Sequence, residues 1–226
     1  MNYFSASVPP NEVERLEAVQ FYVHLPLRHQ IFQAVVGLTA SVFRTPISIM
    51  SIVEDTQVQY PGSVGLPVPE RMNRIDCICS AAIYTHDTTI LRDLQQHPCP
   101  WVSPESQAQT SFEFYAGTPL LTEHDFAIGT LCVLDREDRL FPAADQELLR
   151  RLARLAMQLL ELHRLRAEQP NAPMPEWLGI EALLTQAQQD LLHLAGAEQQ
   201  PEREQLVQML EQRIERIYDR ARHYGW

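Results

Sequence analysis

Three cysteines and a histidine in the middle of the chain have the residue types and spacing for metal or redox chemistry. One residue separates Cys77 from Cys79. After seventeen intervening residues, one residue likewise separates His97 from Cys99. Zinc takes about four thiolate or imidazole ligands in a tetrahedron, so these four residues are a candidate metal site. Paired zinc ligands more often have two residues between them, so inert buried thiols remain the alternative.

The same thiols are candidates for a redox site if a positive charge stabilises their thiolates. Arg74 and Arg92 are the candidates by position in the sequence. A cysteine-dependent reductase, a redox or metal sensor and inert thiols are therefore three interpretations. Haem ligation by one of the eight histidines also stays open, and the sequence leaves the cofactor unknown.

Motifs of common catalytic sites do not occur in the sequence. It has no nucleophile elbow, no glycine-rich phosphate loop and no paired metal motif. All 18 basic residues are arginine, so Schiff-base chemistry and a phosphate-binding lysine are excluded for this chain. The sequence therefore predicts a protein that is not an enzyme.

Charge and composition narrow the classes of partner. A net charge of -11, from 29 acidic and 18 basic side chains, argues against nucleic acid and anionic membranes as partners. The hydrophobic fraction of 45% and charged fraction of 21% are typical of a folded globular protein. No apolar run reaches membrane length, and Met1 to Asn11 lacks a signal-peptide pattern. We therefore expect a cytoplasmic protein with reduced cysteines.

The first two thirds of the chain predict a mixed domain. Two helices are expected near the N-terminus, and the second, Leu27–Phe43, carries an apolar stripe suited to a sheet. Tyr60–Pro69 is expected to be a loop or an edge, and Cys77–Tyr84 is either a short helix or a strand. Strands are predicted over Pro46–Val53, Thr89–Leu94, Ser111–Leu121 and Phe126–Leu134, the last two forming a hairpin.

The last predicted strand is apolar on both faces. Ile128, Thr130, Cys132 and Leu134 alternate with Ala127, Gly129, Leu131 and Val133, so we expect both faces of the sheet to be covered.

The last third of the chain predicts long helices. Over Ala143–Glu168, leucines at spacings of four and three residues form a seam typical of a partner helix, and we expect a coiled-coil dimer interface there. Proline residues end this helix, and two further helices are expected over Glu176–Leu194 and Glu202–Arg222. The sequence thus divides into a domain at 1–168, a proline-rich linker at 169–175 and a helical hairpin at 176–226. The seam consists of Leu148, Leu152, Leu155, Leu159 and Leu162.

Several strings give the chain a resemblance to a known family. The specific ones are Cys79–Ile83 (CSAAI), Phe114–Leu120 (FYAGTPL) and Gly129–Asp135 (GTLCVLD). Together with residues from Asn11 to Ser51 they resemble a GAF domain, over about Asn11 to Leu162. The resemblance is to GAF domains found ahead of bacterial histidine kinases and diguanylate cyclases.

The resemblance implies an α+β fold and a ligand cavity. The expected fold is a six-stranded antiparallel sheet with helices on one face and a cavity roofed by short helices and loops on the other, followed by the helical hairpin. The chain departs from the family at Gln96–Trp101, at Glu123–Asp125 and at Gln59–Gly62, in loops that would line the cavity. The candidate ligand-binding residues are the polar groups on or beside apolar strands, namely Ser51, Arg92, Asp93, Tyr115 and Thr130.

These observations predict a bacterial regulatory protein that binds a small molecule and passes the signal through dimerising helices. The expected partners are a second copy of the chain and an unidentified protein bound by the C-terminal helices. The alternative is a ligand-free dimerisation or adaptor scaffold. The sequence leaves open whether the hairpin packs against its own chain or against another.

Overall fold

The computed structural model describes residues 8–169, 175–193 and 200–224. Its centre is an antiparallel sheet of six strands in the order β3-β2-β1-β6-β5-β4, which confirms the predicted α+β class. The strands are β1 Ile47–Val53, β2 Gln57–Val64, β3 Arg71–Asn73, β4 Thr89–Arg92, β5 Phe114–Leu121 and β6 Ala127–Asp135. The helices are α1 Glu12–Val23, α2 Gln30–Phe43, α3 Pro104–Ala108, α4 Ala143–Glu168, α5 Pro175–His193 and α6 Gln200–Tyr224, with 3-10 helices η1 Arg74–Asp76 and η2 Ile78–Tyr84.

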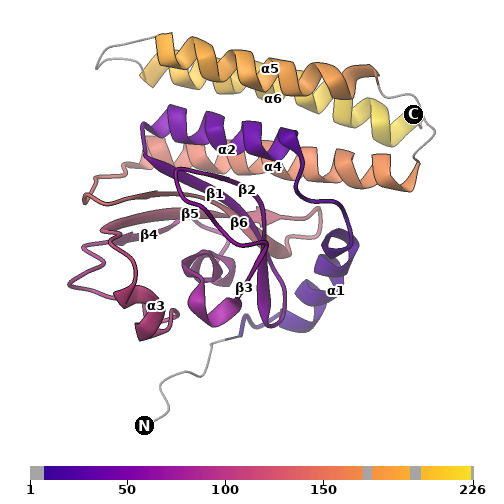
Figure 1. Ribbon diagram of the computed structural model, residues 1–226. Coiled ribbons are helices and arrows are strands. Elements are labelled where there is room, and N and C mark those ends of the chain that lie inside the picture. The colour runs from indigo at the N-terminus through magenta and orange to yellow at the C-terminus, as the bar shows by residue number, and fades with distance from the viewer. Residues whose placement is uncertain (1–7, 170–174, 194–199, 225–226) are drawn as a thin grey trace.

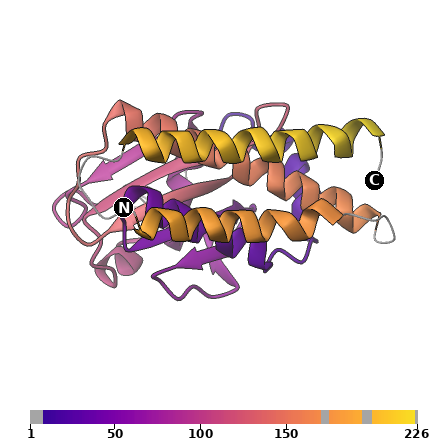
Figure 2. The same ribbon diagram turned by 90° about the horizontal axis from the view of Figure 1, so that it is seen from above.

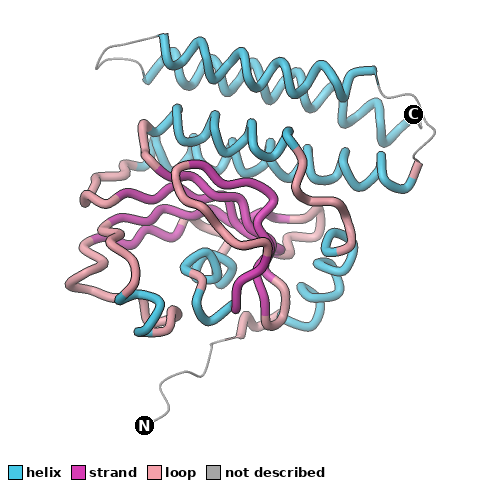
Figure 3. Tube along the Cα trace, viewed as in Figure 1, coloured by secondary structure: helices cyan, strands magenta, loops and turns pink. Residues whose placement is uncertain are grey.

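The elements form layers on the two sides of the sheet. Helices α2 and α4 lie side by side on one face, and α5 and α6 lie over them as an outer layer (Figure 1). Figure 2 shows that α5 and α6 run antiparallel along the molecule. The opposite face carries η1, η2, α3 and long loops (Figure 3). The helical hairpin is thus confirmed, and it packs against its own chain.

The strands separate two apolar cores, as their alternation predicted. Leu131 and Val133 of β6 point to the helices, whereas Cys132 and Leu134 point to the opposite side. The prediction fails at the start of β6, where Ile128 lies in the helical core and Ala127 in the other. The cause is a bulge: Gly129 pairs with Leu120 and Ala127 with Leu121, so Ile128 is the extra residue.

The expected loop at Tyr60–Pro69 is partly wrong, because Gln57–Val64 forms an inner strand between β1 and β3. A proline inside a strand removes a ladder donor, which argues against an inner position. Here Pro61 lies at an irregularity, where pairing shifts between Met50–Gly62 and Ile52–Gln59. The bulge accommodates Pro61.

Helix α2 lies in direct contact with β2. A side chain at Gly62 would place its Cβ 2.6 Å from the carbonyl oxygen of Phe32, so only glycine allows this approach. Next to it, the Gln33 side chain donates to the Ser63 carbonyl oxygen (2.7 Å) and accepts from the Ser63 amide (3.3 Å). The helix and the strand are therefore joined by both packing and paired hydrogen bonds.

The leucine seam of α4 lies inside the chain. All five leucines are at most 2% exposed, in a core that also contains Val207, Leu210 and Ile214 of α6. At the edge of this contact Arg151 and Glu211 form an ion pair at 2.7 Å. The expected partner helix is therefore α6 of the same chain, and the seam is core rather than a free dimer surface.

The start of α5 docks on two histidines. The ring of Trp177 stacks on His163 with centroids 5.6 Å apart and meets the edge of His29 at 5.5 Å. Burial, with the nearby positive charge of a protonated His29, lowers the pKa of His163 to about 4. His163 is therefore neutral near pH 7, and its Nε2 lies 3.1 Å from the carbonyl oxygen of Pro26.

Helix α1 is held by a buried ionic cluster. The Arg15 side chain is 0% exposed, pairs with Glu12 (Nε to Oε2, 2.6 Å) and donates to the carbonyl oxygen of Val53 (2.6 Å). Arg74 of η1 binds the other oxygen of Glu12. Burial alone would raise the pKa of the Glu12 carboxyl, but its bonds to the two arginines outweigh burial and lower it. The cluster joins α1, β1 and η1.

Candidate functional site

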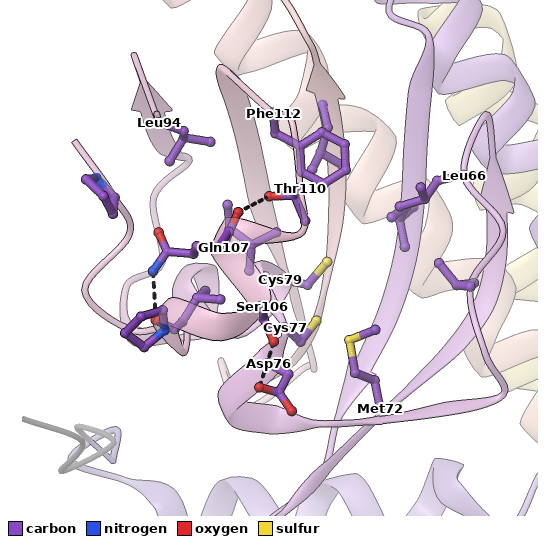
Figure 4. A pocket seen from close by; sticks show the side chains of 18 of the residues that line it. Leu66, Met72, Asp76, Cys77, Cys79, Leu94, Ser106, Gln107, Thr110 and Phe112 are labelled. Atoms are coloured by element: carbon purple, nitrogen blue, oxygen red, sulfur yellow. Dashed lines mark hydrogen bonds between the residues drawn. The ribbon is translucent and has the colours of Figure 1, made fainter. Parts of the chain in front are cut away.

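A cavity of about 470 Å³ lies on the face of the sheet opposite α2 and α4 (Figure 4). Ile49 of β1, Tyr60 of β2 and Leu134 of β6 line it from the sheet. Its size is within the range of small-molecule sites. Its walls come from the 66–79 and 94–112 segments: Leu66, Val68, Met72, Asp76, Cys77, Ile78, Cys79, Leu94, Gln95, Pro98, Val102, Pro104, Ser106, Gln107, Ala108, Thr110 and Phe112.

The charged group of the wall is Asp76, and it is occupied by the protein itself. Its Oδ1 accepts hydrogen bonds from the hydroxyls of Ser103 (2.6 Å) and Ser106 (2.8 Å), and Oδ2 accepts from Asn73 (3.1 Å). The bonds from the two serines lower the pKa of Asp76, so it carries its charge at neutral pH. This cluster fastens α3 to η1 and so closes one wall.

Two glutamines add polar groups with a defined orientation. The amide nitrogen of Gln107 donates to the carbonyl oxygens of Cys99 (2.9 Å) and Val102 (2.8 Å). The amide nitrogen of Gln95 donates to those of Thr110 (3.2 Å) and Phe112 (3.1 Å). Since the nitrogens are used within the wall, the carboxamide oxygens are the acceptors that these two side chains retain; Gln95 is exposed and Gln107 is half-buried.

The cysteines of the wall are buried and poorly ionised. Cys77 accepts a hydrogen bond from the Tyr60 hydroxyl at 3.0 Å, and the sulfurs of Cys79 and Cys132 are 3.6 Å apart. The contact with Cys79 and burial raise the pKa of Cys77, and the contact with Cys132 contributes most to the raised pKa of Cys79. Thiols with raised pKa values are weak nucleophiles, so apolar packing is their visible role.

The predicted metal set is not brought together. His97 is exposed on its loop, whereas Cys77, Cys79 and Cys99 are buried. Within the described ranges no three His, Cys, Asp or Glu side chains are grouped closely enough to hold a metal ion.

None of the five predicted ligand residues lines the cavity. Ser51 and Thr130 are fully buried, and the Thr130 hydroxyl donates to the carbonyl oxygen of Cys79 at 3.0 Å, which holds η2 on the sheet. Tyr115 is also fully buried, and its hydroxyl has no hydrogen-bond partner among the described residues.

The other two predicted ligand residues are at the surface. Arg92 is exposed, and its Nε donates to Asp138 at 2.9 Å. Asp93 is exposed as well, with a left-handed backbone (φ 51°) at the turn after β4. The ligand roles of all five residues stay predictions, at positions outside the cavity wall.

Sequence reasoning missed Tyr60, Asp76 and the glutamines, although one signal pointed to part of the wall. Of the three departures from the family, Gln59–Gly62 supplies Tyr60, which lies in strand β2, and Gln96–Trp101 supplies Pro98. Glu123–Asp125 does not line the cavity, so the expectation that the departing loops line it holds only in part.

A second hollow of about 680 Å³ lies between α1, α4, α6 and the turn after β5. Its charged side chains are largely paired with one another, as in Arg164 with Glu161 (3.0 Å) and Arg222 with Glu123 (3.0 Å). Its lining is more polar than that of the first cavity.

The sequence matches the GAF domain family over residues 27–160, more than half of the chain. The chain therefore belongs to the GAF domain family, which agrees with the observed sheet, helices and cavity. The described helices include none that is long and apolar enough to cross a membrane.

The relatives are signalling proteins and enzymes. The chain is 32% identical over 140 residues to a cyclic di-GMP phosphodiesterase of Pseudomonas aeruginosa, a match that spans 61% of this chain and 23% of that protein. It is similar in structure to the GAF domain of a phosphoenolpyruvate-protein phosphotransferase from Coxiella burnetii (TM-score 0.53, 15% identity, 74% of this chain, 99% of that one). A type II free methionine-R-sulfoxide reductase from Thermoplasma acidophilum is also similar (TM-score 0.50, 18% identity, 61% and 94%).

These relatives support a signalling role and correct one prediction. The prediction that the chain is not an enzyme is contradicted, because a phosphodiesterase and a reductase contain similar domains. Each activity belongs to the relative named, and the structural likeness at this identity shows the fold alone.

Proposed function

We propose that the chain is a sensory GAF domain that binds a small molecule in the cavity between the sheet and the 66–79 and 94–112 segments. The observation that carries this proposal is the enclosure itself: about 470 Å³ of largely apolar space. A well-formed apolar pocket with a few convergent polar groups is typical of a ligand site.

The position of the cavity suits a sensor. Its floor residues Ile49 and Leu134 belong to strands whose neighbouring residues, Met50 and Val133, pack under the helices on the other face. A ligand that binds one arrangement of the sheet better than another shifts the population of that arrangement. The signal then passes from the cavity to the helices through β1 and β6, whose side chains point alternately to the two faces of the sheet.

In this proposal the hairpin of α5 and α6 passes the signal on by binding a partner protein. The hairpin covers α2 and α4, so a change in either helix alters its docking. Its outer side carries exposed residues such as Met209, 38% exposed, that do not contribute to the core. The leucine seam is internal, so the proposal does not rely on it for a homodimer.

Native mass spectrometry tests ligand binding directly. The chain is incubated with a low-molecular-weight extract of bacterial cells, freed of unbound material and measured before and after denaturation. We expect a mass excess that disappears on denaturation. A bare chain mass after this incubation would contradict the proposal and favour the ligand-free scaffold, because a ligand with useful affinity must be retained.

A further inference from the structure

The wall of the cavity lacks positive charge. Among the described residues that line it, none is an arginine or a histidine, and the chain contains no lysine. The charged side chain present is the carboxylate of Asp76. A buried phosphate or carboxylate needs a cation or several donors, because removing an unpaired charge from water is unfavourable.

The arginines of the neighbouring segments are committed elsewhere. Arg71 pairs with Glu54 at 2.8 Å, and Arg74 binds Glu12 in the buried cluster of α1. These contacts place both guanidinium groups at α1 and the β1–β2 turn. Neither guanidinium group lines the cavity, although Nε and Nη2 of Arg74 have no hydrogen-bond partner among the described residues.

The hydroxyl donors of the wall are also in use. Ser106 donates to Asp76, as Figure 4 shows, and the Thr110 hydroxyl donates to the backbone carbonyl of Gln107 at 3.0 Å. What the wall offers a ligand is the two acceptor oxygens of Gln95 and Gln107 and a large apolar surface. These acceptors suit a ligand that donates hydrogen bonds.

From this wall we infer that the cavity takes an uncharged, mainly apolar molecule with a hydrogen-bond donor, and that it excludes phosphate-bearing ligands such as cyclic nucleotides. The aromatic side chains of Tyr60 and Phe112 favour a ring in the ligand. This inference rests on the proposed function, because it names the ligand class of the same cavity.

A fluorescence titration of the full chain with N-phenylnaphthylamine tests the inference. This probe is neutral and apolar and carries one N–H donor. We expect saturable binding that cyclic di-GMP and cyclic GMP do not displace. Val68→Trp, in a loop of the wall, and Thr110→Trp, from the opposite wall, should each weaken binding about tenfold or more by filling the space.

The control is Val13→Trp, which adds the same bulk at a site on α1 that is 70% exposed and should bind the probe like the unchanged chain. Saturable binding of either cyclic nucleotide that both wall variants abolish would overturn the inferred ligand class and leave the proposed sensing function intact. Failure of the probe to bind would overturn the inferred ligand class, and the native mass-spectrometry result then decides the proposed function separately.

Discussion

Leu155→Ala separates two interpretations of the α4 seam, an internal core and an interface between chains. Leu155 is 0% exposed and belongs to the core shared by α2, α4, α6 and the sheet. The substitution removes three carbon groups, which costs about 2 kcal/mol in transfer free energy. The void left in a packed core raises the expected loss of unfolding free energy to about 3–5 kcal/mol.

Urea unfolding followed by circular dichroism measures this loss, at two protein concentrations about tenfold apart. Leu140→Ala is the matched control, because Leu140 is 79% exposed, and it should change the unfolding free energy by less than about 0.5 kcal/mol. Since the seam is covered within one chain, Leu155→Ala should lower the midpoint at both concentrations and leave the number of subunits unchanged.

The result that would refute this reasoning is also specific. If the seam joins two chains, the midpoint of the unchanged protein rises with concentration and Leu155→Ala converts a dimer into a monomer. Sedimentation of both proteins would show that conversion. The single-chain core would then be the wrong description of α4 and α6.

Two further predictions concern buried charge. Glu12→Gln should lower the unfolding free energy by about 3 kcal/mol, because it leaves Arg15 and Arg74 without their buried counter-charge, whereas Glu14→Gln on the exposed side of α1 should change it by less than about 0.5 kcal/mol. The pKa of His163 is about 4 in the folded chain and 6.5 in the unfolded chain. The unfolding free energy should therefore fall by about 2 kcal/mol between pH 6.5 and pH 4, because the unfolded state binds a proton that the folded state does not. His163→Gln should flatten this part of a plot of unfolding free energy against pH, measured by urea unfolding.

The hairpin of β5 and β6 and the long α4 could be predicted because they depend on local periodicity. Alternating apolar residues from Leu131 to Leu134 specify a strand covered on both faces, and leucine spacing specifies a helix that needs a partner. The identity of that partner depends on how helices distant in the sequence pack together, which leucine spacing does not encode. The dimer was inferred from a pattern that α6 satisfies within the chain.

The sheet departs from its predicted pattern at two positions, and the cavity wall lies where the sequence gives little signal. Pro61 and Ile128 violate simple strand rules locally, and bulges compensate for both. Ser51 and Thr130 are predicted as polar groups on apolar strands, and their hydroxyls donate to the backbone carbonyl oxygens of Thr130 and Cys79. Much of the cavity wall comes from loops such as 66–70, where no periodic pattern marks a lining residue.

The contact between Gly62 and α2 couples the helix to strand β2, so that the two are expected to move together. The carbonyl oxygen of Phe32 occupies the space that a Cβ at Gly62 would need. The Gln33 side chain bonds both the amide and the carbonyl oxygen of Ser63, so the helix and the strand are closely packed and hydrogen-bonded. Tyr60, three residues before Ser63, lines the cavity. A ligand that displaces Tyr60 is therefore expected to move β2 and α2 together. Because α5 packs on α2, α5 would move with them.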